Sequence, residues 1–447
     1  MSQQIYEPAV LFTGREIRRN TAVLVEDGWI TAVDTPGALR AMAPLAREIR
    51  WENTALLPGT VNVHNHCFQS LLRGLATDRP FLEWRDQALY KFSPLLTPED
   101  LYTGAVFAFS EMMKCGVTTV SDFFYVHNDG VESDEAIIRA ARDVGIRLVL
   151  ARTMYDWDGA PAGYVETVSQ ADNAVRSLMQ RYNGETDRMV TVMPAPHSLH
   201  AASPEMVQAG HQIAVDFDTK FHIHVAEEPF EVEGVQKQFG RRPMELLQDL
   251  GVLDDRMIAV HCVWLDDHEK QLMAAAKAGL AYCPSSNMFL ADGVTDLPAL
   301  LHNGVTVGLG TDGACSNNRN SVFEEMRMAA LLQKVHTCNA LAITGREALE
   351  MGTVAGGRLL GLPVGRIEPG CCADFTGVDL EDLSLQPLYE DYEQLLPNLV
   401  YGMQPSAIDK VVVQGRQTVE GGRLLGVPEP VVVDSVRRLM QKFQDIE

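Results

Sequence analysis

Two histidines one residue apart, His64 and His66, follow an apolar run and a Pro-Gly turn in the segment Leu57-Pro58-Gly59-Thr60-Val61-Asn62-Val63-His64-Asn65-His66. Side chains two residues apart on a strand point to the same side. Two imidazoles on one face of a strand can form half of a transition-metal site. Alone, such a pair is a weak signal, because surface and packed histidines are common.

Further metal-binding side chains follow at the ends of three later apolar runs. These segments are His222-Ile223-His224-Val225-Ala226-Glu227, Val260-His261-Cys262 and Leu309-Gly310-Thr311-Asp312-Gly313. Four such sites in this order predict a metal-dependent hydrolase. Three imidazoles and a carboxylate suit one divalent ion, with Zn²⁺ preferred and Fe²⁺ the alternative, and leave a position open for water. We assign the following ligands: His64, His66, His224 and Asp312.

The same segments supply candidate catalytic groups. His222 shares a face with His224. Only position favours His224 as the ligand, because His224 lies nearer the C-terminal end of the strand. Water on a Lewis acid has its pKa lowered to roughly 7, and Glu227 could take its proton and deliver it to the substrate. Glu228 is more typical of a solvated loop. His261 could orient or polarise the water, or could be a packed histidine. We therefore expect Glu227, His261 and Asp312 to be catalytic.

Apolar runs alternate with helical stretches between residues 58 and 313, and helices begin at Thr97-Pro98 and Ser203-Pro204. Eight β/α units in one run predict a distorted (β/α)8 barrel over residues 58–360. Barrel enzymes place their chemistry at the C-terminal ends of the strands, where all of these candidates lie. The expected strands are Leu57–Val63, Val117–Val126, Ile146–Met154, Met189–Pro196, Lys220–Ala226, Met257–Val263, Leu280–Pro284 and Val305–Gly310.

The two ends of the chain have a different pattern, with short strands and Gly-rich turns. Residues 1–57 and 361–447 are predicted to fold together as a small β-sandwich domain beside the barrel, with a terminal helix over Asp434–Phe443. The expected strands of this domain are Ala9–Phe12, Thr21–Glu26, Trp29–Val33, Ala373–Val378 and Lys410–Val413.

Composition narrows the class of protein. The 447 residues are 46% hydrophobic and 22% charged, as in a soluble globular protein. A net charge of −23 argues against nucleic acid as a partner, since phosphates require a basic surface. No apolar run approaches the roughly 20 residues that span a bilayer, and no export signal is visible at Met1–Glu7. We expect a cytoplasmic protein without membrane contact, whose eight cysteines are reduced and mostly buried.

These motifs together resemble the amidohydrolase superfamily, in the branch of amino-heterocycle deaminases and triazine hydrolases. The resemblance covers essentially the whole chain. It implies one metal ion held by the four ligands above, with Glu227 as the proton shuttle, and suggests a homo-oligomer. Relatives with two metals use a carboxylated lysine on the fourth strand. The segment Met189–Pro196 contains no lysine, which supports a single ion.

Two groups within the superfamily imply different small-molecule substrates. The strand-eight segment from Gly310 to Asn318, together with Pro284–Met288, resembles S-adenosylhomocysteine and methylthioadenosine deaminases; guanine and cytosine deaminases belong to the same branch. The residues that match nucleoside contacts there are Trp84, His197 and Ser316. The arginines that bind the ribose and amino-acid tail have no clear counterpart between Arg152 and His197.

Formimidoylglutamate deiminase is the second, partial resemblance. Gln69, Arg85 and Tyr125 match residues that hold its substrate, but His200 stands where that enzyme has a carboxylate-binding arginine. Simpler explanations remain open for these side chains: Trp84 and Tyr125 could pack against the barrel, Arg85 could be a surface cation, and Ser316 could cap a helix.

The leading hypothesis is hydrolytic deamination of an amino-substituted purine, nucleoside, pyrimidine, pterin or triazine, in which metal-bound hydroxide attacks the ring carbon and ammonia leaves. Iminohydrolysis of a formimidoylglutamate-like amidine, and displacement of chloride or an alkylamine from a triazine, are the alternatives within the same chemistry. A non-catalytic binding protein on the same scaffold is the remaining alternative.

Overall fold

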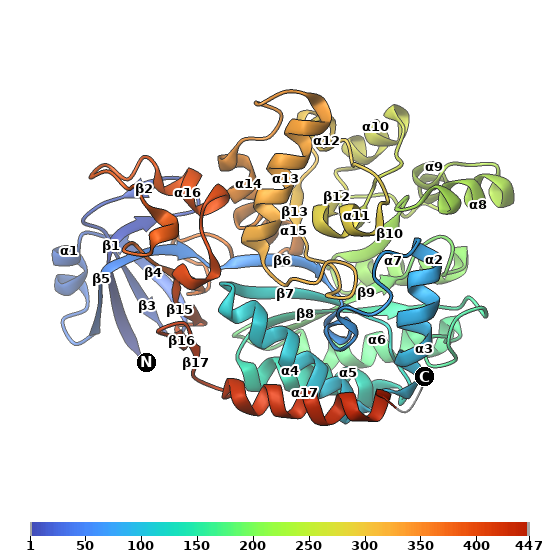
Figure 1. The fold of residues 1–447 in the computed structure, drawn as a ribbon, viewed down its shortest axis with the longest axis horizontal. Coiled ribbons are helices and arrows are strands. Elements are labelled where there is room, and N and C mark those ends of the chain that lie inside the picture. The colour runs from blue at the N-terminus through green and yellow to red at the C-terminus, as the bar shows by residue number, and fades with distance from the viewer. Residues whose placement is uncertain (1, 445–447) are drawn as a thin grey trace.

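The computed structural model describes residues 2–444. Two parallel four-stranded sheets form the barrel in the right part of Figure 1. The first sheet contains β6 (Thr60–Asn65), β7 (Val117–Phe124), β8 (Arg147–Met154) and β9 (Val190–Pro196). The second contains β10 (Phe221–Val225), β11 (Met257–His261), β12 (Gly279–Tyr282) and β13 (Val307–Leu309). Almost every residue of these strands is buried, as expected for parallel strands covered on both faces.

The two sheets meet at seams that are joined near the C-terminal ends of the strands. At one seam the Asp312 N–H donates to the carbonyl of His64 over 3.0 Å. At the other, the His224 N–H donates to the carbonyl of His197 over 2.9 Å. The barrel is therefore distorted, as predicted, and residues beside both seams belong to the predicted metal site.

Helices cover the outside of the barrel strands (Figure 1). The predicted starts at Thr97 and Ser203 are confirmed, and each hydroxyl accepts a hydrogen bond from the first turn. The helices from α2 to α15 are α2 (Phe81–Trp84), α3 (Tyr90–Phe92), α4 (Pro98–Lys114), α5 (Val131–Val144), α6 (Val168–Tyr182), α7 (Pro204–Asp216), α8 (Pro229–Phe239), α9 (Pro243–Asp249), α10 (Asp267–Ala276), α11 (Pro284–Leu290), α12 (Leu297–His302), α13 (Val322–Thr337), α14 (Gly345–Met351) and α15 (Val354–Leu360).

Both ends of the chain contribute to one mixed sheet, which confirms that they fold together. Its strands, nine within the described residues, follow the order β17-β16-β15-β14-β5-β1-β3-β4, with β2 paired to β1. Helix α1 (Pro36–Met42) packs on this sheet, and α16 (Leu395–Tyr401) lies between the sheet and the barrel helices. The strands are β1 (Gln3–Phe12), β2 (Ile17–Arg18), β3 (Ala22–Glu26), β4 (Trp29–Asp34), β5 (Arg47–Pro58), β14 (Phe375–Asp379), β15 (Ile408–Val413), β16 (Arg416–Glu420) and β17 (Arg423–Leu424).

The structure corrects several predicted boundaries. The expected strand Leu57–Val63 is divided at Gly59, because Leu57 and Pro58 belong to β5 of the end sheet and β6 begins at Thr60. A Cβ atom at Gly59 would lie 2.1 Å from Thr118 Oγ1, so only glycine allows this close passage between sheets.

Other boundaries move by a few residues. Pro284 starts α11 rather than ending β12, β13 is limited to Val307–Leu309, and the terminal helix α17 (Glu429–Gln444) begins five residues before the predicted start. It packs along α4 at the lower edge of Figure 1, where Lys114 pairs with Glu429 over 2.7 Å.

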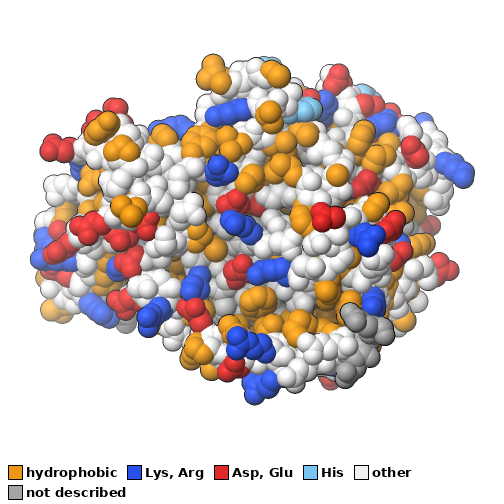
Figure 2. Space-filling model, in the orientation of Figure 1, with side chains coloured by type: hydrophobic (Ala, Val, Ile, Leu, Met, Phe, Trp, Pro, Cys, Tyr) orange, Lys and Arg blue, Asp and Glu red, His pale blue; other side chains and the backbone are white. Residues whose placement is uncertain are grey.

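The surface charge, the helices and the cysteines can be compared with the expectations from composition. Acidic and basic side chains alternate with apolar ones over the face in Figure 2, without a continuous basic patch on that face. Among residues 2–444, no helix is long and apolar enough to span a bilayer. Most cysteines are buried and none is paired in a disulfide in this part of the chain; Cys338 alone among the eight is exposed.

Candidate active site

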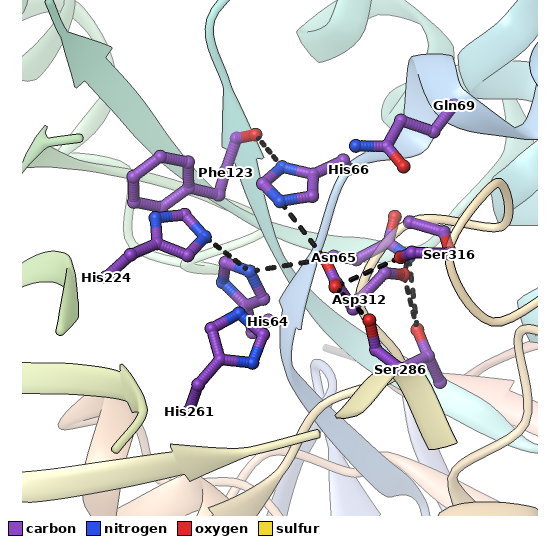
Figure 3. Close-up of polar contacts among 12 residues, drawn as sticks. His64, Asn65, His66, Gln69, Phe123, His224, His261, Ser286, Asp312 and Ser316 are labelled. Atoms are coloured by element: carbon purple, nitrogen blue, oxygen red, sulfur yellow. Dashed lines mark hydrogen bonds and ion pairs between the residues drawn. The ribbon is translucent and has the colours of Figure 1, made fainter. Parts of the chain in front are cut away.

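Four side chains from three parts of the barrel converge at its C-terminal end (Figure 3). His64 and His66 come from β6, with His66 directly after the strand, His224 comes from β10, and Asp312 follows β13. His64 Nε2 lies 3.2 Å from His224 Nε2, and Asp312 Oδ1 lies 3.1 Å from His66 Nε2 and 3.6 Å from His64 Nε2. All four residues are at least 95% buried. The structure thus brings the predicted ligands together.

The hydrogen bonds of the histidine rings indicate which nitrogen carries the hydrogen. His66 Nδ1 lies 2.6 Å from the carbonyl of Phe123, and His224 Nδ1 lies 3.0 Å from the carbonyl of His197. A carbonyl only accepts, so both Nδ1 atoms carry hydrogen, and the Nε2 atom of each ring is bare in the neutral form. Burial lowers the pKa of His64 to about 4 and that of His224 well below its ordinary value, which keeps both rings neutral at pH 7.

The spacing of these donor atoms fits a small divalent ion such as zinc. Bare ring nitrogens and a carboxylate oxygen facing one another repel unless a cation lies between them. Zinc–ligand distances of about 2.0–2.2 Å place neighbouring ligands of a tetrahedron roughly 3.3–3.6 Å apart. The observed separations of 3.1, 3.2 and 3.6 Å lie close to that range. The cluster contains three overlapping sets of three side chains whose donor atoms lie within 4.8 Å of one another. These sets are His64, His224 and His261; His64, His66 and Asp312; and Glu227, His261 and Asp312.

Asp312 is oriented by two hydroxyl groups. Ser286 and Ser316 donate to its Oδ2 over 2.6 and 3.0 Å, which leaves Oδ1 facing the histidines. Ser316 was predicted to contact substrate. In the structure its hydroxyl contacts Asp312, and the substrate contact stays a prediction.

Glu227 and His261 lie on the cavity side of this cluster. Glu227 Oε1 is 3.3 Å from His261 Nε2, and both side chains are over 90% buried. Burial, with Asp292 and Asp312 nearby, raises the pKa of Glu227 well above its ordinary value. A carboxyl group with a raised pKa can both take and return a proton.

The two alternatives weighed for these positions lie elsewhere. Both ring nitrogens of His222 are buried without a hydrogen-bond partner, and the ring lies 5.9 Å from that of His64. It belongs to none of the groups that could hold an ion among the described residues. Glu228 precedes α8 as its N-cap residue and is more exposed than Glu227.

A cavity opens above the cluster. Gln69 donates to the Tyr125 hydroxyl over 2.9 Å, and the Trp84 indole donates to the carbonyl of Cys315 over 3.1 Å. Arg85 begins a π-helical turn over Arg85–Leu89. Its guanidinium lies 4.5 Å from the centre of the Tyr90 ring, which follows this turn. Predicted residues that line this cavity are Gln69, Trp84, Arg85, Tyr125, His197 and His200.

Sequence reasoning missed part of the cavity wall. The lining residues that it did not predict include Tyr90, Tyr155 and Tyr164. Tyr155 and Tyr164 lie in the segment between β8 and α6, and Tyr90 lies in short helical turns after Trp84. No spacing in these segments marks a side chain as facing the cavity, so the sequence held no signal for them.

A buried ionic cluster lies behind this wall. Arg152 donates to Asp134 over 3.2 Å and to both oxygens of Glu166, over 2.5 and 2.9 Å. His127 Nδ1 lies 3.3 Å from Asp134. The Glu166 N–H donates to the carbonyl of Tyr155 over 2.8 Å, so this cluster fixes both ends of the loop that carries the two missed tyrosines.

Comparison with known proteins places this site in a family. Residues 55–418 match the Amidohydrolase family. A 5-methylthioadenosine/S-adenosylhomocysteine deaminase from Syntrophomonas wolfei is 34% identical over 424 residues, 94% of each chain. A 5'-deoxyadenosine deaminase from Methanothermobacter thermautotrophicus is 32% identical over 434 residues, 95% of this chain and 96% of its own. The structure of an adenosine deaminase from Xanthomonas campestris with bound zinc superposes with a TM-score of 0.92, at 27% identity and 99% coverage of both chains.

The chain therefore belongs to the amidohydrolase family, which confirms the predicted family, fold class and hydrolase chemistry. Within that family, the relatives compared above are deaminases of adenosine or its derivatives. A triazine hydrolase from Arthrobacter aurescens shares the fold, with a TM-score of 0.90 at 23% identity over 98% of this chain and 99% of its own.

Proposed function

We propose that this protein is a zinc-dependent deaminase that releases ammonia from an adenine-type ring, with 5'-modified adenosines as the first candidate substrates. The relatives named above support the substrate class. The observation that carries the proposal is the position of Glu227 and His261, which face a largely aromatic cavity directly above the cluster of histidines and Asp312. A cavity lined by aromatic side chains, with polar groups placed among them, suits a planar nitrogen heterocycle.

In this proposal the ion is held by His64, His66, His224 and Asp312. When bound, it supplies a Lewis acid that lowers the pKa of a water molecule to roughly 7. The bare Nε2 atoms of His66 and His224 and the free Oδ1 of Asp312 support these assignments. Zinc is the preferred ion, because the adenosine deaminase that shares this fold contains it.

The protein's own residues then transfer two protons and hold the substrate ring. Glu227 takes a proton from the attacking water and passes it to the ring nitrogen beside the amino-bearing carbon. A C–O bond forms at that carbon. Glu227 then takes the second proton from the new hydroxyl group and passes it to the amino group. The C–N bond breaks, ammonia leaves, and the hydroxyl oxygen becomes the ring carbonyl. His261 donates a hydrogen bond beside the reacting carbon. Trp84 and Tyr125 hold the substrate ring by stacking.

The test is ammonia release from a panel of substrates by the zinc-loaded protein. The panel contains 5'-deoxyadenosine, methylthioadenosine, S-adenosylhomocysteine, adenosine, adenine, guanine, cytosine and a chloro- and an alkylamino-triazine. We expect turnover of at least one adenosine derivative, with the matching inosine product. Silence on every amino-heterocycle from a fully metallated protein would overturn the proposal.

Arg85 favours a second candidate substrate. It is the only lysine or arginine among the residues that line the cavity, and its side chain is 19% exposed. A cation in this position could bind an acidic group on an acyclic amidine such as formimidoylglutamate. If the protein turns over that compound and the Arg85→Met variant does not, the proposed substrate would change from an adenine-type ring to an acyclic amidine. That the chain forms a homo-oligomer stays a prediction.

A further inference from the structure

The ring of His261 has a different hydrogen-bonding partner from the rings of His66 and His224. Its Nδ1 lies 3.1 Å from the side-chain amide nitrogen of Asn287, in the first turn of α11. An amide nitrogen only donates. His261 Nδ1 is therefore the acceptor, and the hydrogen of the neutral ring is on Nε2.

The other end of the ring supports the same assignment. His261 Nε2 lies 3.3 Å from Glu227 Oε1, an oxygen that accepts a hydrogen bond when Glu227 is ionised or carries its proton on the other oxygen. By contrast, His66 and His224 donate from Nδ1 to carbonyl groups and present bare Nε2 atoms. A ring nitrogen that carries hydrogen has no lone pair for a metal ion. His261 therefore differs from the ligands although it lies within the same cluster.

We propose that Asn287 and Asp292 are positioning residues that fix His261 as a hydrogen-bond donor and exclude it from the metal coordination. Asp292 Oδ2 accepts from the same amide nitrogen over 3.0 Å, so Asn287 is held between the carboxyl and the imidazole. Both Asn287 and Asp292 are 1% exposed, and bulk water does not compete for these contacts. The kinetic part of this proposal rests on the proposed deaminase function, but the tautomer does not.

The carboxyl of Asp292 keeps this orientation in either protonation state. Burial raises the pKa of Asp292 to about 9. Oδ2 faces an N–H donor, so a proton on this carboxyl binds to the buried Oδ1. The neighbouring carboxyl of Glu228 also raises the pKa of Asp292. The reverse orientation of the amide would need hydrogens on both Asp292 Oδ2 and His261 Nδ1, and would turn a bare His261 Nε2 toward the oxygen of Glu227.

Nitrogen NMR of the zinc-loaded protein tests the tautomer directly. Couplings between ring carbon-bound protons and ¹⁵N distinguish the nitrogen that carries hydrogen from the bare one, and His261 is assigned by the signals lost in His261→Gln. We expect hydrogen on Nε2 of His261. Hydrogen on Nδ1 of this ring in the wild-type protein would overturn the proposal, whatever the substrate is.

An exchange of the two side chains, Asn287→Asp with Asp292→Asn, tests the positioning role without changing net charge. The carboxylate at 287 would accept from Nδ1 and move the hydrogen there. We expect an inverted tautomer, unchanged zinc content and a kcat lower by about 10–100-fold with little change in KM. Asp296→Asn, the same chemical change in a half-exposed side chain four residues later, is the control and should keep wild-type kcat.

If the exchanged protein does not fold, Asn287→Leu removes the donor with little change in volume. It is expected to bind zinc and to show both tautomers of His261. Full kcat in either folded variant would refute the positioning role. A correct tautomer in a protein that deaminates nothing would instead count against the proposed function alone.

Discussion

The floor and the wall of the cavity are built in opposite ways. The floor consists of side chains at the ends of barrel strands, such as His64, His224 and His261, whose backbone is held by the parallel sheets. The wall consists of short helical turns between residues 67 and 95 and of the loop that carries Tyr155 and Tyr164. The predicted catalytic groups lie at strand ends held by the sheets, and much of the predicted substrate contact lies on connections.

The two regions also differ in how their polar groups are paired. In the wall, hydroxyl groups pair with each other: Tyr90 with Tyr155 over 3.2 Å and Ser93 with Tyr164 over 2.6 Å. In the floor, bare nitrogens and a carboxylate oxygen face each other. These hydroxyl groups of the wall are therefore paired without a ligand, whereas the floor needs a cation. Metal removal should disturb the floor and leave the wall intact.

The largest effect is expected in the floor, at Glu227. Glu227→Gln keeps the size of the side chain but removes its ability to take a proton. We expect kcat to fall by about 10²–10⁴-fold, the usual contribution of general acid–base catalysis, while zinc content is unchanged. Rapid-quench or steady-state ammonia assays with metal analysis measure this. Wild-type kcat in a zinc-loaded Glu227→Gln protein would remove Glu227 from the mechanism.

The next effect is in the cluster behind the wall. Arg152→Met leaves the fully buried Asp134 and the partly exposed Glu166 without their guanidinium. Breaking a buried ion pair from one side typically costs about 3–5 kcal/mol, and urea unfolding measures that loss. Arg139→Met is the matched control, because its partner Glu99 is exposed and such pairs contribute about 0–1 kcal/mol. Equal losses in the two variants would contradict the account of the wall.

A smaller effect is expected at Ser286, which contacts Asp312 and not the ion itself. Ser286→Ala removes the 2.6 Å hydrogen bond to Oδ2 and leaves the second one, from Ser316. Loss of such a supporting contact usually weakens metal binding by about 10–100-fold. Competition with a zinc chelator measures the affinity. Unfolding of the metal-free protein should be nearly unchanged, which separates an effect on the ion from one on the fold.

The acid sensitivity of the fold should depend on the wall cluster. Burial opposes ionisation of Asp134, but Arg152 and His127 hold its pKa below the ordinary value. A carboxyl with a lowered pKa stabilises the fold above its unfolded pKa of about 3.9, and this stability is lost as pH falls through the folded value. The free energy of unfolding should therefore fall less steeply below pH 4 in Asp134→Asn than in the wild type. Urea unfolding at a series of pH values measures this. The same dependence of the unfolding free energy on pH in both proteins would contradict this role.

The same division decides how much can be predicted from the sequence. Period-two spacing and strand ends predict that His64, His66, His224, Glu227 and Asp312 lie together, and the structure brings them together in the floor. Their roles as ligands and proton shuttle stay predictions. The wall depends on how irregular segments fold back over the barrel, and Tyr155 and Tyr164 follow no period that a sequence pattern could reveal.

Contacts between segments far apart in the chain are also beyond a sequence pattern. Ser286 and Asn287 lie in a segment noted only for its resemblance to relatives, and their bonds to Asp312 and His261 exist only once α11 packs beside β13 and β11. The division of the expected strand Leu57–Val63 at Gly59 depends in the same way on Thr118, more than fifty residues later. Runs of apolar residues show that a strand forms, and tertiary contacts decide which sheet it joins.

The central claim is that one ion in the floor makes the protein a deaminase. The most direct measurement is ammonia release from the best adenosine derivative as zinc is added back to chelator-treated protein. The account predicts no turnover in the metal-free protein and a rate that rises linearly and saturates at one zinc ion per chain. Full turnover without metal, or a rate that requires two ions per chain, would contradict it.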